Sequence, residues 1–316
     1  MHGIELAQKY YESFGKSMLE GEFAGLLPYL AVGYVGSGSE HYGFDDEISH
    51  DHDYEPGFCI FLPGEDVVDR RSAFLLERAY AKLPKEYGGA KRQIVSPVGG
   101  NRNGVIRTGE FYEKAVGSQN GELTVLQWLR IPDYALAEAV NGEVFFDNYG
   151  EFTKIREHLK NMPRDIKLKR IAGNLLVMGQ SGQYNFMRCI NHGEPQAAQF
   201  AVTEFVNAAM KVTFLLNGRY MPYYKWSFRA LRETMGEDEM CQNLSFLMFG
   251  DNGDPSVCKQ KYLTIEKIAQ NIIGRLKDSG MTGAVCGDLE KHAYSLNDKI
   301  TDGDIRNMNI FIAVGE

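Results

Sequence analysis

Short apolar runs separated by turn residues predict strands among helices in the first half of the chain. Residues 30–34 and 57–62 read as two buried strands, and residues 143–147 read as a third strand between turn signals. Apolar positions at helical spacing predict helices over 4–20 and 69–83. The predicted buried face of the second helix comprises Phe74, Leu75, Ala79 and Leu83.

Other parts of the first half give weaker patterns. Residues 87–118 read as loops with short strands, because glycine and polar residues dominate there. Residues 123–130 fit a strand and a helix equally well, because so short an apolar run has no decisive period.

The second half is predicted to be helical. From 195 to 216 apolar residues recur every three or four positions, and Gly218 follows as a left-handed helix end. A further helix carries YYKWSFRALRETM, and another spans Ile265 to Leu276. Helices joined by short connections imply a bundle. Strand signals stop near residue 160, so the sequence predicts an α+β fold with a mixed sheet and flanking helices over 1–160, followed by an α-helical bundle domain over 161–316.

Composition narrows the classes of function. The 316 residues correspond to about two domains at roughly 150 residues each. Acidic residues outnumber basic ones by 42 to 34, and a net charge of −8 makes nucleic acid an unlikely partner. No apolar stretch reaches the roughly 20 residues of a membrane span. The N-terminus lacks the features of a secretory signal, and five scattered cysteines fit neither a disulfide framework nor a thiolate zinc site. We therefore expect a cytoplasmic protein.

The segment GSGSEHYGFDDEISHDHDYEPGF, residues 36–58, is rich in acids. Its seven acidic residues are Glu40, Asp45, Asp46, Glu47, Asp51, Asp53 and Glu55. So many carboxylates are unfavourable together unless water or cations neutralise them, and an acidic surface loop is the simplest explanation. However, Asp51 and Asp53 alternate directly before an apolar strand, so that in an extended chain both project from one face. Two such oxygen ligands suit magnesium.

Ser37, Gly38 and Ser39 leave the preceding strand through a glycine-rich turn. Glycine lets the backbone approach a ligand closely, and exposed N–H groups with two hydroxyls would cradle a triphosphate. Combined with the aspartates downstream, the turn predicts a site for a metal-bound nucleotide.

Gly38-Ser39, eleven intervening residues and then Asp51-His52-Asp53 resemble the signature of the polymerase-beta-like nucleotidyltransferase superfamily. The longer string is similar to a bacterial branch described only as a domain of unknown function. EVFFDNYGEFTKIREHL, from Glu143, and MPYYKW, from Met221, resemble later motifs of that branch.

The resemblance implies a nucleotidyltransferase-like sheet in which the glycine–serine turn holds the phosphates and the Asp pair binds two Mg²⁺ ions. A third carboxylate then completes the site and deprotonates the acceptor. Asp147, which ends a predicted strand, is the candidate, and Glu143 is the alternative because strand parity points it to the same face. Lys225, flanked by aromatic residues, is implied as a ligand of the triphosphate.

The activity implied is magnesium-dependent transfer of a nucleoside monophosphate from a nucleoside triphosphate, with ATP expected, to a hydroxyl group. The two-domain layout resembles antibiotic nucleotidyltransferases, so an aminoglycoside-like small molecule is one acceptor class and a protein hydroxyl is another. A homodimer is compatible with this activity.

Two other functions stay open. A degenerate member of the superfamily would be a non-catalytic binding module or an antitoxin-type partner, although Gly38, Ser39 and the Asp pair are retained. A metal-dependent phosphohydrolase would use histidines of the acidic segment as ligands. The histidines concerned are His41, His50 and His52.

Overall fold

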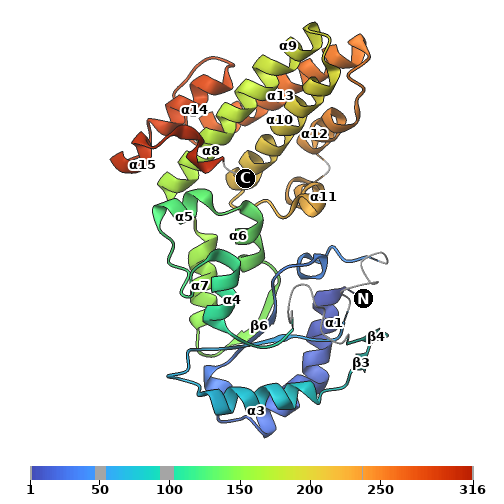
Figure 1. Ribbon diagram of the computed structural model, residues 1–316, viewed down its shortest axis with the longest axis vertical. Helices are drawn as coiled ribbons and strands as arrows, with labels where there is room; N and C mark the ends of the chain where they lie inside the picture. The colour runs from blue at the N-terminus through green and yellow to red at the C-terminus, as the bar shows by residue number, and fades with distance from the viewer. Residues whose placement is uncertain (1, 47–54, 93–102, 237, 315–316) are drawn as a thin grey trace. The chain divides into compact units, whose positions relative to one another are not determined.

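A computed structural model describes residues 2–46, 55–92, 103–236 and 238–314 (Figure 1). The chain forms two compact units. The first comprises residues 1–122 and 135–161, and the second comprises residues 123–134 and 162–316. The first unit contains the sheet, and the second is helical.

The first unit is built on a mixed four-stranded sheet in the order β5-β2-β1-β6. Its strands are β1 (Ala31–Tyr34), β2 (Cys59–Leu62), β5 (Gly104–Arg107) and β6 (Glu143–Asp147). The central strand β1 pairs antiparallel with both β2 and β6, whereas β2 pairs parallel with β5. A separate small hairpin joins β3 (Glu86–Tyr87) to β4 (Ala90–Lys91).

One face of the sheet packs on the N-terminal helices and on α3. The N-terminal run consists of α1 (Gly3–Tyr10), a π-helical turn over Tyr11–Gly15 and α2 (Lys16–Gly21). Helix α3 (Arg70–Ala81) begins after Asp69, whose side chain accepts the N–H of Ser72. Alternate strand residues such as Val32 and Ile60 are fully buried against these helices, because successive strand side chains point to opposite faces.

The other face packs on α4 (Thr108–Val116) and α7 (Glu151–Lys160). Phe61 stacks on Phe152 of α7 at 4.1 Å between ring centroids and contacts Phe111 of α4 edge-on at 5.3 Å. Aromatic pairs at such separations add to the stabilisation from burial. Helices therefore cover both faces of the sheet. Helix α6 (Asp133–Val140) leads into β6.

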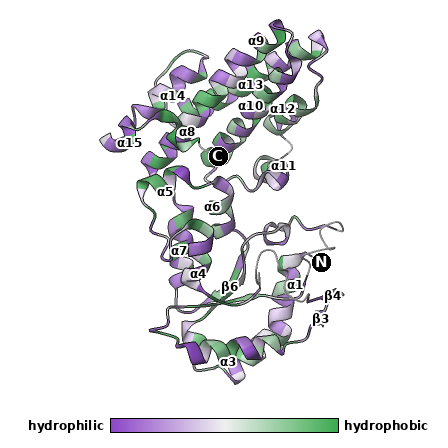
Figure 2. Ribbon diagram, in the orientation of Figure 1, coloured by the Kyte–Doolittle hydropathy of each residue, from purple (hydrophilic) through white to green (hydrophobic). Residues whose placement is uncertain are grey.

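Helices are the only regular secondary structure among the described residues of the second unit. Its helices are α5 (Val125–Arg130), α8 (Arg164–Met178), α9 (Phe186–Asn191), α10 (Pro195–Leu216), α11 (Tyr224–Met235), α12 (Glu239–Phe249), α13 (Pro255–Asp278), α14 (Leu289–Asn297) and α15 (Gly303–Asn307), with a 3₁₀ turn over Ile310–Ala313. A π-helical segment, Gly179–Asn185, joins α8 to α9. Figure 2 shows that these helices carry both hydrophobic and hydrophilic residues, as amphipathic bundle helices do.

The predicted α+β fold, with a mixed sheet and flanking helices followed by a helical bundle, is confirmed. Within it, the face predicted for α3 is half right: Ala79 and Leu83 pack in the core, but Phe74 and Leu75 are 55% and 46% exposed, and Leu76 and Tyr80 are buried instead. The position of the sheet decides which side of the helix is buried. Residues 123–130 resolve as helix α5, which begins with a capping box between Thr124 and Gln127.

Two further observations concern the whole chain. In the described ranges no helix is both long enough and apolar enough to cross a membrane. All five cysteines are free thiols, and Cys59, Cys241 and Cys258 are buried. Burial raises the pKa of the Cys59 thiol to about 12, so this side chain is a neutral packing residue at pH 7.

Candidate active site

The glycine–serine turn follows the C-terminal end of β1. Gly36 and Gly38 have φ values of +126° and +123°, a region that side chains with a Cβ rarely adopt. Ser37 is exposed, and Ser39 is 7% exposed. Within the described ranges, no acceptor takes a hydrogen bond from the backbone N–H of Ser37, Gly38 or Ser39. Successive backbone donors of this kind suit an anion such as a phosphate.

A 3₁₀ turn, Ser39–Tyr42, continues from the glycines and buries the side chains of Glu40 and His41. Glu40 is 5% exposed, and its Oε1 lies 3.4 Å from Nδ1 of His41. The His41 ring stacks on Tyr34 at 4.2 Å between centroids. Burial raises the pKa of the Tyr34 hydroxyl well above its ordinary value, and the Glu40 carboxylate acts in the same direction. His41 therefore has a packing role against β1.

The acidic segment is divided by the fold. Asp45 is buried and accepts the backbone N–H of Gly3 at 2.9 Å, which stabilises the start of α1. Glu55 accepts a hydrogen bond from Asn103 at 3.2 Å. Asp46 is exposed. The remaining predicted residues lie outside the described residues: Glu47, His50, Asp51, His52 and Asp53.

The two candidates for the third carboxylate lie at opposite ends of β6. Glu143 is paired with Tyr34, at the end of β1 that leads into the glycine–serine turn. Asp147 is paired with Ala31, at the other end of β1. At about 3.3 Å per residue the two positions are about 13 Å apart along the strand. The fold therefore brings Glu143, and not Asp147, to the end of the sheet that carries Gly38.

A β-bulge in β6 also places the side chains of Glu143 and Asp147 on opposite faces of the sheet. The register shifts between Val32 and Gly33, so that Phe145 is an extra residue on β6. Phe145 and Phe146 both contact the Tyr11 ring, at 5.7 and 6.0 Å. Two successive side chains thus share one face, and the alternation is inverted beyond them. The parity argument that gave Glu143 and Asp147 a common face is wrong for this strand.

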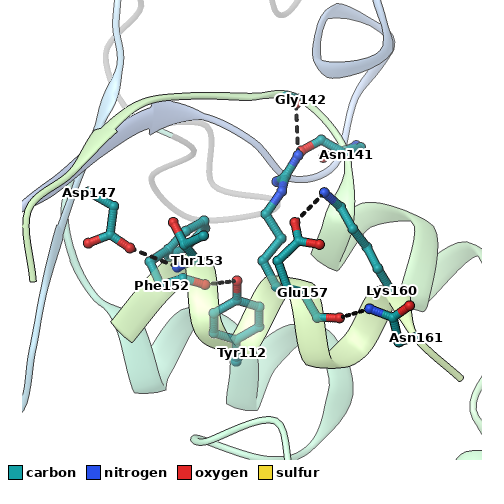
Figure 3. Close-up of polar contacts among 10 residues, drawn as sticks. Tyr112, Asn141, Gly142, Asp147, Phe152, Thr153, Glu157, Lys160 and Asn161 are labelled. Atoms are coloured by element: carbon teal, nitrogen blue, oxygen red, sulfur yellow. Dashed lines mark hydrogen bonds and ion pairs between the residues drawn. The ribbon is translucent and has the colours of Figure 1, made fainter. Parts of the chain in front are cut away.

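Asp147 instead connects β6 to α7. One carboxylate oxygen accepts the N–H of Gly150 at 2.7 Å, and the other accepts the N–H of Thr153 at 2.8 Å. Figure 3 shows Asp147 beside Thr153, with Asn141 and Gly142 near the other end of the strand. Both acceptors serve donors at the start of a helix, which otherwise lack intrahelical partners.

The turn before β6 presses against the end of β1. Gly142 has a φ of +63°, and a Cβ built on it would lie 2.1 Å from the carbonyl oxygen of Tyr34 and 2.9 Å from Cα of Val35. Both neighbours are backbone atoms, so neither can move aside without displacing a strand. Glycine at this position permits the start of β6 to pack closely against the end of β1.

Replacing Gly142 with alanine is therefore expected to destabilise the protein by about 2–6 kcal/mol, because positive φ and overpacking each cost about 1–3 kcal/mol. Gly150 is the matched control. It follows the same strand at φ +81°, but nothing lies within 4 Å of its Cβ position. Urea unfolding should give the larger loss for Gly142→Ala, and equal losses would show that the close approach carries no cost.

Lys225 lies in the first turn of α11, in the second unit, and is exposed. Its Nζ lies 4.9 Å from the centre of the Trp226 ring, a cation–π contact. Tyr223 and Tyr224 are 45% and 72% exposed, so neither is a core residue. The phosphate-binding role of Lys225 stays a prediction.

Metal binding rests on residues that the structure describes only in part. Among the described residues, no three His, Cys, Asp or Glu side chains gather closely enough to hold a metal ion. The predicted metal ligands Asp51 and Asp53 lie outside the described residues, so their magnesium-binding role stays a prediction. Two further residues contribute to this region and carry no sequence signal: Asn141 bonds to Gly36 of the glycine-rich turn, and Arg156 of α7 bonds to the carbonyl oxygens of Asn141 and Gly142.

Comparison with known proteins adds two findings. A family described as a domain of unknown function, DUF4037, matches residues 128–227, which are 100 of the 316 residues. This segment includes Asn141, Glu143 and Lys225 but begins after the glycine–serine turn. A nucleotidyltransferase-like protein from Exiguobacterium sibiricum 255-15 is similar at 12% identity and a TM-score of 0.30, over 91% of this chain and 89% of that one. No curated protein matches the chain.

Proposed function

We propose that the chain is a magnesium-dependent nucleotidyltransferase, which transfers a nucleoside monophosphate from a nucleoside triphosphate to a hydroxyl group. The observation that carries the proposal is the register of the sheet. The end of β1 leads into the glycine–serine turn, and Gly33 near that end pairs with Cys59, the first residue of β2. Glu143, the first residue of β6, pairs with Tyr34 at the same end of β1.

The aspartate pair enters this argument through the order of the chain. Asp51 and Asp53 precede Glu55 by a few residues in the sequence, and Glu55 leads into β2. A phosphate-binding turn, an Asp pair and a third carboxylate would then lie together at one end of the sheet, where β1 terminates and β2 and β6 begin. Positioning and charge neutralisation are the main requirements of nucleotidyl transfer, and this set of groups supplies both.

The proposed reaction forms one bond and breaks one. The oxygen of the acceptor hydroxyl attacks the α-phosphorus, the bond from that phosphorus to the oxygen bridging the α- and β-phosphates breaks, and pyrophosphate leaves. The hydroxyl proton passes to a carboxylate, for which Glu143 is exposed and available. The N–H groups of Ser37, Gly38 and Ser39 bind phosphate oxygens and fix the triphosphate against the end of β1.

The donor set fits magnesium. Asp51, Asp53 and Glu143 offer carboxylate oxygens, which are the ligands that this hard cation prefers. When bound, Mg²⁺ would neutralise charge on the triphosphate and on the leaving pyrophosphate. Asp147 is the less suitable third ligand, because both of its oxygens accept backbone N–H groups of the α7 region.

A thermal-shift series tests the proposal directly. The full-length protein is heated with ATP, GTP, CTP or UTP, each with and without MgCl₂. We expect stabilisation that needs both components, amounting to about 2.7 kcal/mol at 100 times the Kd. ATP is the triphosphate we expect to act most strongly. Acceptor candidates, including amino sugars and hydroxyl-bearing proteins, are then screened with α-labelled triphosphate for transfer of the label.

The same series separates the other functions. A binding module that lacks the nucleotide site would show no stabilisation by any triphosphate with magnesium, and this result would reject the proposal. A phosphohydrolase would consume triphosphate without an acceptor. Replacement of His41, whose ring is 2% exposed and stacks on Tyr34, would then abolish that turnover.

A further inference from the structure

The side chain of Asn141 forms two hydrogen bonds with the backbone of one residue in the glycine-rich turn. Its Oδ1 accepts the N–H of Gly36 at 2.9 Å, and its Nδ2 donates to the carbonyl oxygen of Gly36 at 2.6 Å. An amide side chain can donate and accept at once, so it satisfies both backbone groups of Gly36 in the way that a neighbouring strand would. These two bonds connect the turn to Asn141, which directly precedes Gly142 and Glu143 in the chain.

The backbone of Asn141 is in turn hydrogen-bonded to a side chain of α7. The Arg156 guanidinium donates to the carbonyl oxygen of Asn141 at 2.5 Å and to that of Gly142 at 2.9 Å. Arg156 is 8% exposed, and these charge-assisted bonds are partly buried. The bond to Gly142 is visible in Figure 3, where Asn141 and Gly142 are labelled. A continuous set of contacts thus runs from α7 through Asn141 to Gly36.

We propose that Asn141 is a positioning residue, which holds the glycine–serine turn at a fixed distance from Glu143 and so prepares the turn to bind the phosphates of the triphosphate. The inference rests on the proposed function. Asn141 does not touch the nucleotide: it acts through Gly36, two residues before Gly38. Groups that bind a reacting ligand need this support, since a turn that is 1 Å out of place loses much of its binding energy.

The matched control is Asn148, at the other end of the same strand. Its Nδ2 donates to the carbonyl oxygen of Leu27 at 3.0 Å, so it also fastens β6 to a neighbouring loop, but far from Gly36. The test compares wild type, Asn141→Ala and Asn148→Ala. Asn141→Asp serves as a second variant, because it keeps the shape and the acceptor for the Gly36 N–H while losing the donor.

Two measurements are made on each protein. Hydrogen–deuterium exchange followed by mass spectrometry reports on peptides that cover residues 33–42. In Asn141→Ala we expect the amide exchange rate in these peptides to be about 10-fold higher than in wild type, or more. A loss of about 1.4 kcal/mol of local stability corresponds to that factor. Titration with magnesium and triphosphate should give a Kd raised about 10-fold or more. In Asn148→Ala both quantities should match wild type.

The outcomes distinguish the inference from the function on which it rests. Exchange in 33–42 that is unchanged in both Asn141 variants would overturn the positioning role, whether or not triphosphate binds. Faster exchange with an unchanged Kd would reduce Asn141 to a structural residue and also overturn it. If wild type binds no triphosphate, the proposed function fails and the positioning role for phosphates fails with it, while the exchange data still report whether Asn141 holds the turn.

Discussion

Replacing Asp51 or Asp53 with asparagine is expected to lower nucleotidyl transfer by about 10³-fold or more, because a bound metal contributes several kcal/mol of charge stabilisation and each 1.36 kcal/mol is a factor of ten. Asparagine keeps the size of the side chain but removes the negative charge that a magnesium ion needs. The expected loss therefore concerns transfer and magnesium dependence, with the melting temperature of the protein alone left close to that of wild type.

The measurement is transfer of an α-labelled nucleotide, with magnesium varied over a wide range. Asp46→Asn is the matched control, because Asp46 belongs to the same acidic segment and is exposed. It should retain the activity of wild type. Near-wild-type turnover in either Asp51→Asn or Asp53→Asn would show that the Asp pair does not bind the catalytic metal ions, and the proposed two-metal reaction would be rejected.

Local pattern was sufficient to predict the strands β1, β2 and β6 and helices such as α3 and α10, but not the individual helices α7 and α8. Residues 30–34 and 143–147 are predicted as strands from short apolar runs near turn residues, and they form the paired strands β1 and β6. Helix α4, in contrast, lies inside a segment read as loops with short strands. The buried residues of α4 are Thr108, Tyr112 and Val116, which do recur every four positions, but the helix has only 9 residues and lies among glycine and polar residues.

The site was harder to predict, because it depends on register. Asp147 is predicted as the third carboxylate because it ends a strand. Which end of β1 a residue of β6 lies beside, however, depends only on its pairing partner. A bulge is equally hidden in the sequence, since Phe145-Phe146 reads as an ordinary apolar pair. Asp45 shows a further limit: its bond to the N–H of Gly3 joins residues 42 positions apart, which no local pattern reveals.

The two candidate carboxylates of β6 should respond in opposite ways to isosteric replacement. Glu143→Gln is expected to lower transfer by about 10²-fold or more, the contribution typical of a positioned acid or base, with little change in stability because Glu143 is exposed. Asp147→Asn is expected to lower stability by about 1 kcal/mol, because asparagine keeps one acceptor oxygen and leaves the N–H of Gly150 or Thr153 without its partner, and to leave turnover by the folded protein close to wild type.

Both variants are compared with wild type by urea unfolding and by transfer of labelled nucleotide, so that each serves as the control for the other. The reasoning depends on the placement of Asp147 opposite Ala31, with its oxygens bound to the N–H groups of Gly150 and Thr153. If Asp147→Asn lost transfer while keeping its stability, and Glu143→Gln kept both, Asp147 would be the third carboxylate. The glycine–serine turn could then no longer be the phosphate site, because the two lie at opposite ends of β1.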